Sequence, residues 1–240
     1  MQQRVTNRPP FGIELRFERA EIDQMCVDEL EKAKALPATP GPINIESFIG
    51  KHFCKDYRYE DLPEGVLGVT AFEPNGRIKF VGVSSKLDDE SRSAEHRIRS
   101  TWAHEAGHCM LHPILFMRDP STRAQVFWEQ GSANITSDRR FLCRDQDFKL
   151  QSANCGYDGR WWEWQANRCI GGFLLPKFLV IKSLEKLLRP SRVTNIPELP
   201  EENRSPAESL VSQVFNVSIA ASRIRLAEFF PHGSASQLTF

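Results

Sequence analysis

Apolar and charged residues alternate at helical spacing near the start of the chain, over residues 15–36. Apolar side chains that return every three or four residues line one face of an amphipathic helix. Two prolines follow directly and would end such a helix. A second, shorter helix is expected over residues 43–53, with Asn44 as its N-cap. Residues 1–12 show no such pattern and are expected to form a loose arm.

The pattern changes to strand-like alternation over residues 55–60, 66–72 and 77–83. The last two segments flank Glu73-Pro-Asn-Gly76, and Asn-Gly is a strong signal for a two-residue turn, so a β-hairpin is predicted. We expect a small antiparallel sheet with one edge strand that binds an extended peptide through backbone hydrogen bonds. The alternative is a sheet with a purely structural role.

Helical patterns return over residues 93–112, 160–174 and 178–188. Residues 114–159 lie between the first two of these helices and show no clear period. We expect this segment to cover one side of a functional site and to shape its specificity.

The C-terminal part divides into a linker rich in Pro, Asn and Glu at 190–206 and two short helices within 207–240. The helices meet near Ser218, a suitable N-cap, with spacing like that of a helix-turn-helix. We expect them to pack on a preceding domain at 13–189. The predicted fold class is α+β.

The composition narrows the possible functions. The chain has 31 Lys and Arg against 31 Asp and Glu, so its formal net charge is zero. This balance argues against direct binding of nucleic acid or membranes, and Arg223 and Arg225 are too few to predict a DNA-recognition helix. No apolar run approaches the roughly 18 residues of a membrane span, and the N-terminus lacks an apolar signal core. We expect a cytoplasmic protein.

The predicted helix at 93–112 contains His104-Glu-Ala-Gly-His108, which matches the pattern H-E-x-x-H. Histidines four residues apart lie one turn apart on one helix face, so both imidazoles can bind one metal ion. Glu105 could accept a proton from a water on that ion. Five-letter matches also arise by chance, but the amphipathic helix and the following Pro113 supply the context that a metal site needs.

A catalytic zinc site needs a third protein ligand beside an open position. Glu163 is the only carboxylate in residues 160–176, where it lies among tryptophans and apolar residues. A carboxylate in such surroundings should pair, bind a metal or change its protonation. Asn167, four residues on, could hydrogen-bond a ligand histidine and fix its tautomer. The alternative is a Glu163 that faces solvent at a helix end, with the tryptophans in the core.

Further residues compete for a role at such a site. His112 follows His108 by one turn, but eight residues turn it by about 80° from the first motif histidine, so one ion could not easily bind all three. We expect His112 to pack against the site or to hydrogen-bond a ligand. Tyr157 could reach an oxyanion, with an exposed tyrosine as the alternative. Cys143 and Cys155 could form a disulfide or, with a third partner, a second metal site.

The two motifs together resemble the ImmA/IrrE family of metallopeptidases, through H-E-A-G-H-C-M-L-H at 104–112 and E-W-Q-A-N-R, then F-L-L-P, at 163–176. The resemblance implies a zincin-like (gluzincin-like) peptidase fold. It also implies that His104, His108 and Glu163 bind Zn²⁺, with Mn²⁺ as the alternative metal, and that Glu105 is the general base.

The chain departs from the usual family pattern in two ways. Cys169-Ile170 replaces the common Phe-Ala, and 55 residues separate His108 from Glu163, a longer gap than the family pattern leads us to expect. Neither change removes a ligand, although the long gap bears on the identity of the third one.

The resemblance further implies limited proteolysis of a partner protein, often a helix-turn-helix transcriptional repressor. We therefore expect a zinc-dependent metallo-endopeptidase. A hypothesis of another class is a metal-containing binding module that sequesters a transcription regulator without cutting it. Glu105 favours chemistry, because a structural metal site does not need a general base. A DNA-binding regulator that acts through the C-terminal helices is a third hypothesis, which the zero net charge disfavours.

Overall fold

The computed structural model describes residues 2–5, 11, 13–117, 135–136, 140–144, 160–190 and 197–231. The chain forms two compact units, of which the first comprises Met1–Ala35 and Asn44–Phe173 and the second Leu36–Ile43 and Leu174–Phe240. Helices and a sheet occur together in the first unit, so the fold class is α+β, as predicted. The predicted domain at 13–189 includes parts of both units and remains a prediction.

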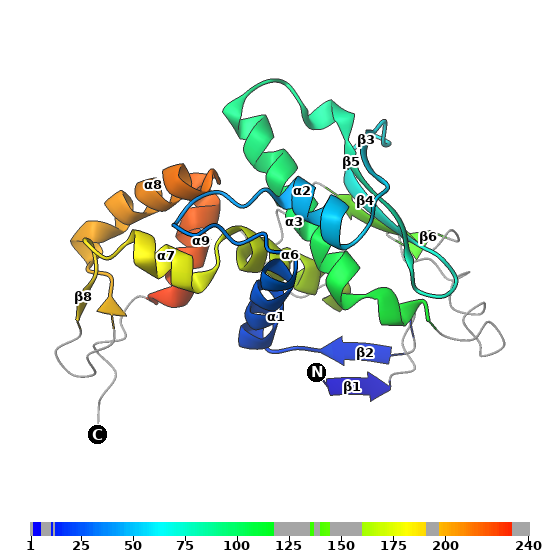
Figure 1. Cartoon of the computed structure of the whole chain (residues 1–240), viewed down its shortest axis with the longest axis horizontal. Helices are drawn as coiled ribbons and strands as arrows, with labels where there is room; N and C mark the ends of the chain where they lie inside the picture. The colour runs from blue at the N-terminus through cyan, green and yellow to red at the C-terminus, as the bar shows by residue number, and fades with distance from the viewer. Residues whose placement is uncertain are drawn as a thin grey trace. The chain divides into compact units, whose positions relative to one another are not determined.

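Five strands form the main sheet of the first unit, in the order β3-β5-β4-β7-β6 (Figure 1). Neighbouring strands are antiparallel except β3 and β5, which are parallel. The predicted antiparallel sheet is therefore wrong in this respect, because β3 pairs with the second strand of the hairpin and not with the first. This pairing joins segments that are not adjacent in the sequence, so the apolar and polar alternation within β3 does not predict it. The strands are β3 (Tyr57–Glu60), β4 (Val66–Phe72), β5 (Ile78–Ser84), β6 (Ile135–Thr136) and β7 (Arg140–Arg144).

The predicted hairpin is formed by β4 and β5, but its turn is longer than two residues. The Glu73 N–H donates to the Arg77 carbonyl (2.7 Å), and the Gly76 N–H donates to the Glu73 carbonyl (3.0 Å). Gly76 has φ of +80°, which only glycine adopts without strain. A three-residue loop that ends in a left-handed glycine gives this arrangement, so the Asn-Gly signal predicted the hairpin but not the length of its loop.

Helix α3 (Arg92–Leu111) packs against β4, β5 and β7. It begins where the Ser91 side chain accepts a hydrogen bond from the Ala94 N–H (3.1 Å), and Pro113 follows directly after its C-cap. Every residue from Thr101 to Cys109 is buried. The H-E-x-x-H residues therefore lie inside the protein and not on its surface.

The N-terminal segment differs from the expected loose arm. Strand β1 (Gln2–Val5) pairs antiparallel with β2 (Ile13–Arg16), and β2 displaces the start of helix α1 to Arg19. Helix α1 then runs to Lys32. Helix α2 (Ile45–His52) begins as predicted, with the Asn44 side chain accepting a hydrogen bond from the Ser47 N–H (3.0 Å).

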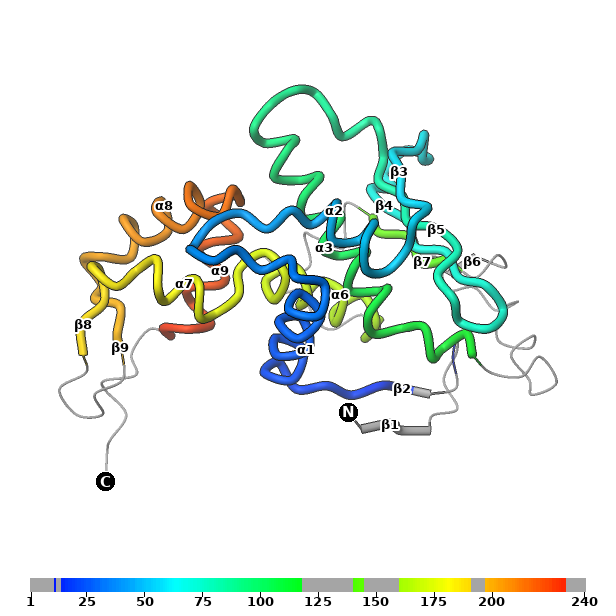
Figure 2. Tube along the Cα trace, in the orientation of Figure 1, coloured from blue at the N-terminus to red at the C-terminus, as the bar shows by residue number. Residues whose placement is uncertain are grey.

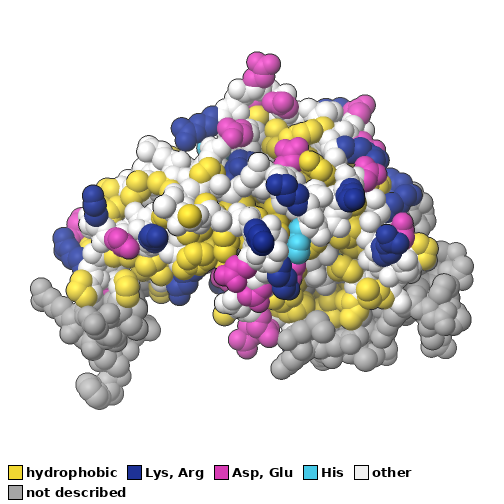
Figure 3. Space-filling view, viewed as in Figure 1, with side chains coloured by type: hydrophobic (Ala, Val, Ile, Leu, Met, Phe, Trp, Pro, Cys, Tyr) yellow, Lys and Arg dark blue, Asp and Glu magenta, His cyan; other side chains and the backbone are white. Residues whose placement is uncertain are grey.

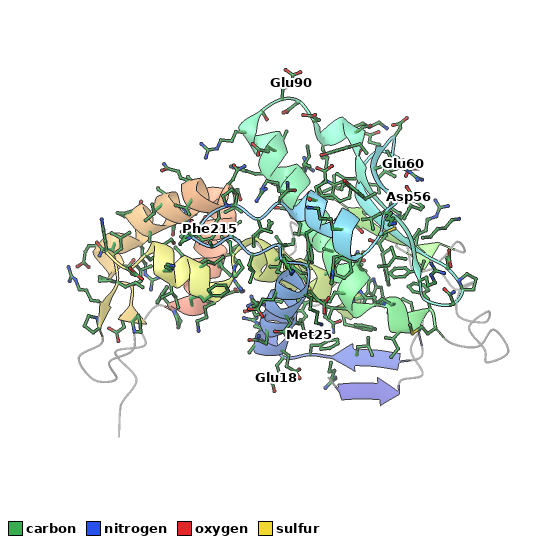
Figure 4. All side chains as sticks on the ribbon, viewed as in Figure 1. Glu18, Met25, Asp56, Glu60, Glu90 and Phe215 are labelled. Carbon is green, nitrogen blue, oxygen red and sulfur yellow. The ribbon has the colours of Figure 1, made fainter. Side chains whose placement is uncertain are left out.

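The second unit is mainly helical (Figure 2). Asn216, in the left-handed conformation, ends α8, and the Ser218 side chain caps α9 as predicted by accepting from the Ala221 N–H (3.1 Å). Phe215, labelled in Figure 4, is fully buried. The linker predicted at 190–206 is partly wrong, because it contains a short strand and the start of α8. The elements are α7 (Lys177–Ser183), β8 (Arg189–Pro190), β9 (Pro197–Glu198), α8 (Arg204–Phe215) and α9 (Ile219–Phe229).

The two arginines considered for DNA recognition are engaged within this second unit. Arg225 is 2% exposed and donates to the Leu175 carbonyl (3.2 Å), and Arg223 pairs with Glu208 (3.0 Å). On the face drawn in Figure 3, Lys and Arg side chains are interspersed with Asp and Glu. Among the described residues, no helix is both long enough and apolar enough to cross a bilayer.

Helix α6 (Trp161–Leu174) approaches α3 closely at Gly107. A Cβ atom at Gly107 would lie 2.9 Å from the Cys169 Cβ and 3.0 Å from the Ala166 Cα. The Ala166 Cα is a backbone atom, so it can retreat only if α6 itself moves. Gly107 therefore sets the distance between the two helices that carry the candidate ligands.

We predict that Gly107→Ala destabilises the fold. Overpacking of this kind costs about 1–3 kcal/mol, which the better helix propensity of alanine only partly offsets. Urea denaturation should show a lower midpoint than wild type. Gly41→Ala is the control, because a Cβ there meets nothing closer than the Thr39 carbonyl oxygen at 3.7 Å. An unchanged urea midpoint for Gly107→Ala would show that α3 and α6 can accommodate a methyl group at this position.

Candidate metal centre

Helix α3 places the two motif histidines on one face, one turn apart. Their Nε2 atoms lie 3.1 Å from each other, and neither side chain has any exposed surface. Each ring nitrogen that faces the other histidine is therefore removed from water. Two such nitrogens at this distance either share a proton or bind a common cation.

Helix α6 brings Glu163 to the same point. Its Oε2 lies 3.2 Å from the Nε2 of His104 and 3.6 Å from that of His108. The residue is 3% exposed, and neither carboxylate oxygen has a well-aligned hydrogen-bond donor among the described residues. The alternative of a solvent-facing Glu163 is wrong. A buried carboxylate without hydrogen bonds costs several kcal/mol unless a cation compensates it.

These three residues could hold one metal ion. Their ligand atoms all lie within 4.8 Å of one another, and all three side chains are buried. Two imidazoles and one carboxylate form a donor set that suits zinc and other transition metals. The geometry and the orphaned Glu163 oxygens thus fit a metal, although they do not identify which one.

The sheet covers the site with one face of β4 and β7. Gly68 pairs with Cys143 and Thr70 with Phe141, so all four residues point the same way. The Phe141 ring stacks on His108, with centroids 4.3 Å apart and planes 10° apart. Residues 114–159 show no clear period, so nothing in the sequence predicted this role of Phe141.

Thr70 and Gly68 hold the Glu105 carboxylate. The Thr70 hydroxyl donates to Glu105 Oε2 (2.5 Å), and Glu105 is fully buried. At Gly68 a Cβ would lie 2.4 Å from Glu105 Oε1, so only glycine leaves space for this carboxylate. Thr70 was missed, although a polar residue in an otherwise apolar strand was a signal; that it contacts Glu105 could not be predicted.

Asn167 contacts His104 as predicted. Its Oδ1 lies 2.9 Å from His104 Nδ1. Because an amide oxygen only accepts, the Nδ1 must carry the proton that it donates. The lone pair of the neutral ring is then on Nε2, the atom that faces Glu163.

A longer chain of hydrogen bonds orients His108. His108 Nδ1 lies 2.9 Å from His112 Nδ1, and His112 Nε2 lies 3.2 Å from the Oε1 of Gln165. The Gln165 amide in turn donates to the Leu15 carbonyl (2.6 Å). That last bond fixes which end of the amide is oxygen, so His112 donates from Nε2 and accepts at Nδ1. His108 must then donate from Nδ1, which leaves its Nε2 free to bind a metal.

The charges of the buried groups follow from this packing. Burial alone raises the pKa of the Glu163 carboxyl, but the His108 and His104 rings outweigh it and hold that pKa well below its usual range. Burial lowers the pKa of His108 to about 4. Burial also acts to lower the pKa of His104, but the Cys143 thiol and Glu163 outweigh it and raise that pKa. The opposite shifts of the His104 and Glu163 pKa values are those of an imidazole and a carboxylate that stabilise each other.

The remaining sequence predictions fare differently. His112 hydrogen-bonds a candidate ligand, which is one of its two predicted roles. Tyr157 and Cys155 lie outside the described residues. Cys143 is a free thiol, buried at the metal centre, and burial raises its pKa to about 12. Gln165 was missed, although a polar residue two positions from Glu163 in a tryptophan-rich helix was a signal.

Comparisons with known proteins do not extend the motif resemblance. No model of a protein family matches the chain, and no curated protein matches it. The likeness to a metallopeptidase family therefore rests on the residues of α3 and α6.

Gln165→Leu should weaken metal binding. The substitution removes both the acceptor for His112 and the donor to Leu15, so His108 is no longer held in the tautomer that binds metal. Loss of such an outer contact typically costs 10–100-fold in metal affinity. Competition with a chromophoric chelator measures this affinity. Gln213→Leu, an exposed position on α8, is the control. If the two variants bind metal equally well, the hydrogen bonds that link His108 to Gln165 do not support metal binding.

Proposed function

We propose that this protein is a zinc-dependent metallo-endopeptidase. The observation that carries the proposal is the Glu105 carboxylate, held by Thr70 directly beside the cluster of His104, His108 and Glu163. A structural metal site has no need of such a group. A hydrolytic site needs a buried base within reach of the metal.

Each residue has a distinct part in the proposed reaction. His104, His108 and Glu163 would hold the ion, with Asn167 and His112 orienting the two rings. Glu105 accepts the proton of the attacking water and then donates it to the leaving amine. Zinc held there would supply Lewis acidity, which brings the pKa of a bound water to about 7 and polarises the scissile carbonyl.

The surroundings of Glu105 suit a base that changes its protonation. The Thr70 hydroxyl can donate to the carboxylate and turn to accept from the carboxylic acid. The Gly68 position leaves the second oxygen room, and no side chain of its own competes there. Burial keeps bulk water from exchanging protons with Glu105 during the reaction.

The zincin-like fold and membership of the ImmA/IrrE family belong to this proposal. They are supported by the motif residues and by an H-E-x-x-H helix packed on a sheet next to a second ligand helix. From the same resemblance we infer that the substrate is a partner protein, such as a helix-turn-helix repressor. We expect it to be cut at one extended segment.

The opposing hypothesis is a binding module that keeps the metal and sequesters a regulator without cutting it. It predicts the same ligands and the same metal content. The two hypotheses differ only in what Glu105 does, so a substitution confined to its charge separates them.

Glu105→Gln should abolish cleavage and leave metal in place. The amide keeps the shape of the side chain and can still meet Thr70, but it cannot accept the water proton. General-base assistance is worth about 10²–10⁴-fold in rate, so cleavage of a co-expressed candidate repressor should fall at least 100-fold. Immunoblots of the repressor measure cleavage, and elemental analysis of tag-free protein measures metal.

Glu163→Ala is the matched variant, because it removes a ligand from the same centre and should lose both metal and cleavage. If Glu105→Gln relieves repression as well as wild type, with the repressor intact in both, sequestration replaces hydrolysis as the function.

A further inference from the structure

Cys143 places a thiol at the metal centre. Its Sγ, a nitrogen of His104 and a carboxylate oxygen of Glu105 all lie within 4.8 Å of one another. His104 also belongs to the cluster with His108 and Glu163, so the two clusters share one imidazole. Cys143 has no exposed surface and is within hydrogen-bonding reach of His104.

The sheet holds this thiol in place. Cys143 pairs with Gly68 of β4, two positions along β7 from Phe141, which stacks on His108. Alternate residues of a strand share a face, so Cys143 must also point toward α3. The pairing of β7 with β4 therefore keeps this side chain on the α3 side of the sheet.

Two buried thiols of the first unit have different neighbours. The Sγ of Cys26 lies 4.0 Å from the Cys169 carbonyl, where α1 and α6 meet. Cys143 instead lies beside the His104 imidazole and the Glu105 carboxylate. Imidazole, carboxylate and thiolate are all ligands that zinc binds.

The Glu163 carboxylate at this centre needs a compensating positive charge. Glu163 is 3% exposed, and neither of its oxygens has a well-aligned donor in the described part of the chain. Zinc prefers four ligands, and thiolate sulfur is among those that it binds best. A thiol beside a bound divalent metal loses its proton and coordinates.

We propose that Cys143 is a fourth protein ligand, which closes the metal centre of His104, His108 and Glu163 in the resting protein. The proposal rests on the proposed function. As the bond from sulfur to metal forms, the thiol proton leaves, and Glu105 is a base within reach to accept it. When that bond breaks, the thiolate takes this proton back from Glu105, which is then again a free carboxylate. Hydrolysis then requires displacement of Cys143, so the resting enzyme is latent.

Cobalt substitution tests the proposal. Metal-free protein is loaded with Co²⁺, and its near-ultraviolet absorption is recorded, where a thiolate bound to cobalt gives a charge-transfer band. We expect the band in wild type and its loss in Cys143→Ser. Cys109→Ser is the matched control, because Cys109 is also buried, on α3, but does not belong to either ligand cluster. It should keep the band.

Two further readouts accompany the spectrum. Cys143→Ser should bind zinc at least about tenfold more weakly than Cys109→Ser, because it loses a ligand. At saturating zinc, Cys143→Ser should cut the partner protein faster than wild type does, because no thiolate has to leave the metal first. If Cys143→Ser fails to fold, Cys143→Ala replaces it. The wild-type spectrum alone already shows whether a thiolate binds the cobalt ion.

The outcomes separate this inference from the proposed function. Co²⁺ uptake without a thiolate band, or a band that survives in Cys143→Ser, overturns the role of Cys143 and leaves the peptidase proposal standing. A band without any cleavage supports Cys143 as a ligand and favours the binding module. Failure to take up Co²⁺ overturns both.

Discussion

Burial of the Glu163 carboxylate against two imidazoles determines how the candidate metal centre is built. A charge that is 3% exposed and lacks aligned donors is stable only beside a compensating cation, either a protonated His104 or a metal. The carboxylate reaches the histidines only because Gly107 lets α6 lie against α3. The ligand set is thus a product of helix packing.

Several further residues hold the candidate ligands in place. Asn167 fixes the tautomer of His104 directly, whereas His108 is fixed through His112, Gln165 and the Leu15 carbonyl. That chain ends on β2, so the N-terminal segment contributes to the metal centre although it carries no ligand. The sheet supplies the opposite wall, with Thr70 on the candidate base and Phe141 on a ligand ring. Both sides of the centre, the helical side and the sheet side, therefore combine apolar packing with a specific hydrogen bond.

The sequence predicted the parts of this centre that are local. His104 and His108 follow from helical spacing, and Asn44 and Ser218 cap helices as their side chains indicate. What could not be predicted depends on contacts between distant segments. The parallel pairing of β3 with β5 is one example, and the position of Cys143 opposite Gly68 is another. No pattern along either strand records which neighbour it will have. Gln165 stands out as a polar residue in a tryptophan-rich helix, but its contacts with His112 and Leu15 could not be predicted for the same reason.

His104, His108 and Glu163 should together hold a single metal ion. Anomalous diffraction can locate this ion, with data collected on either side of the zinc absorption edge from crystals of tag-free protein. We expect one strong anomalous peak per chain, within bonding distance of the two Nε2 atoms and a Glu163 oxygen. A peak elsewhere in the chain, or none in protein crystallised with excess zinc, would exclude this ligand set.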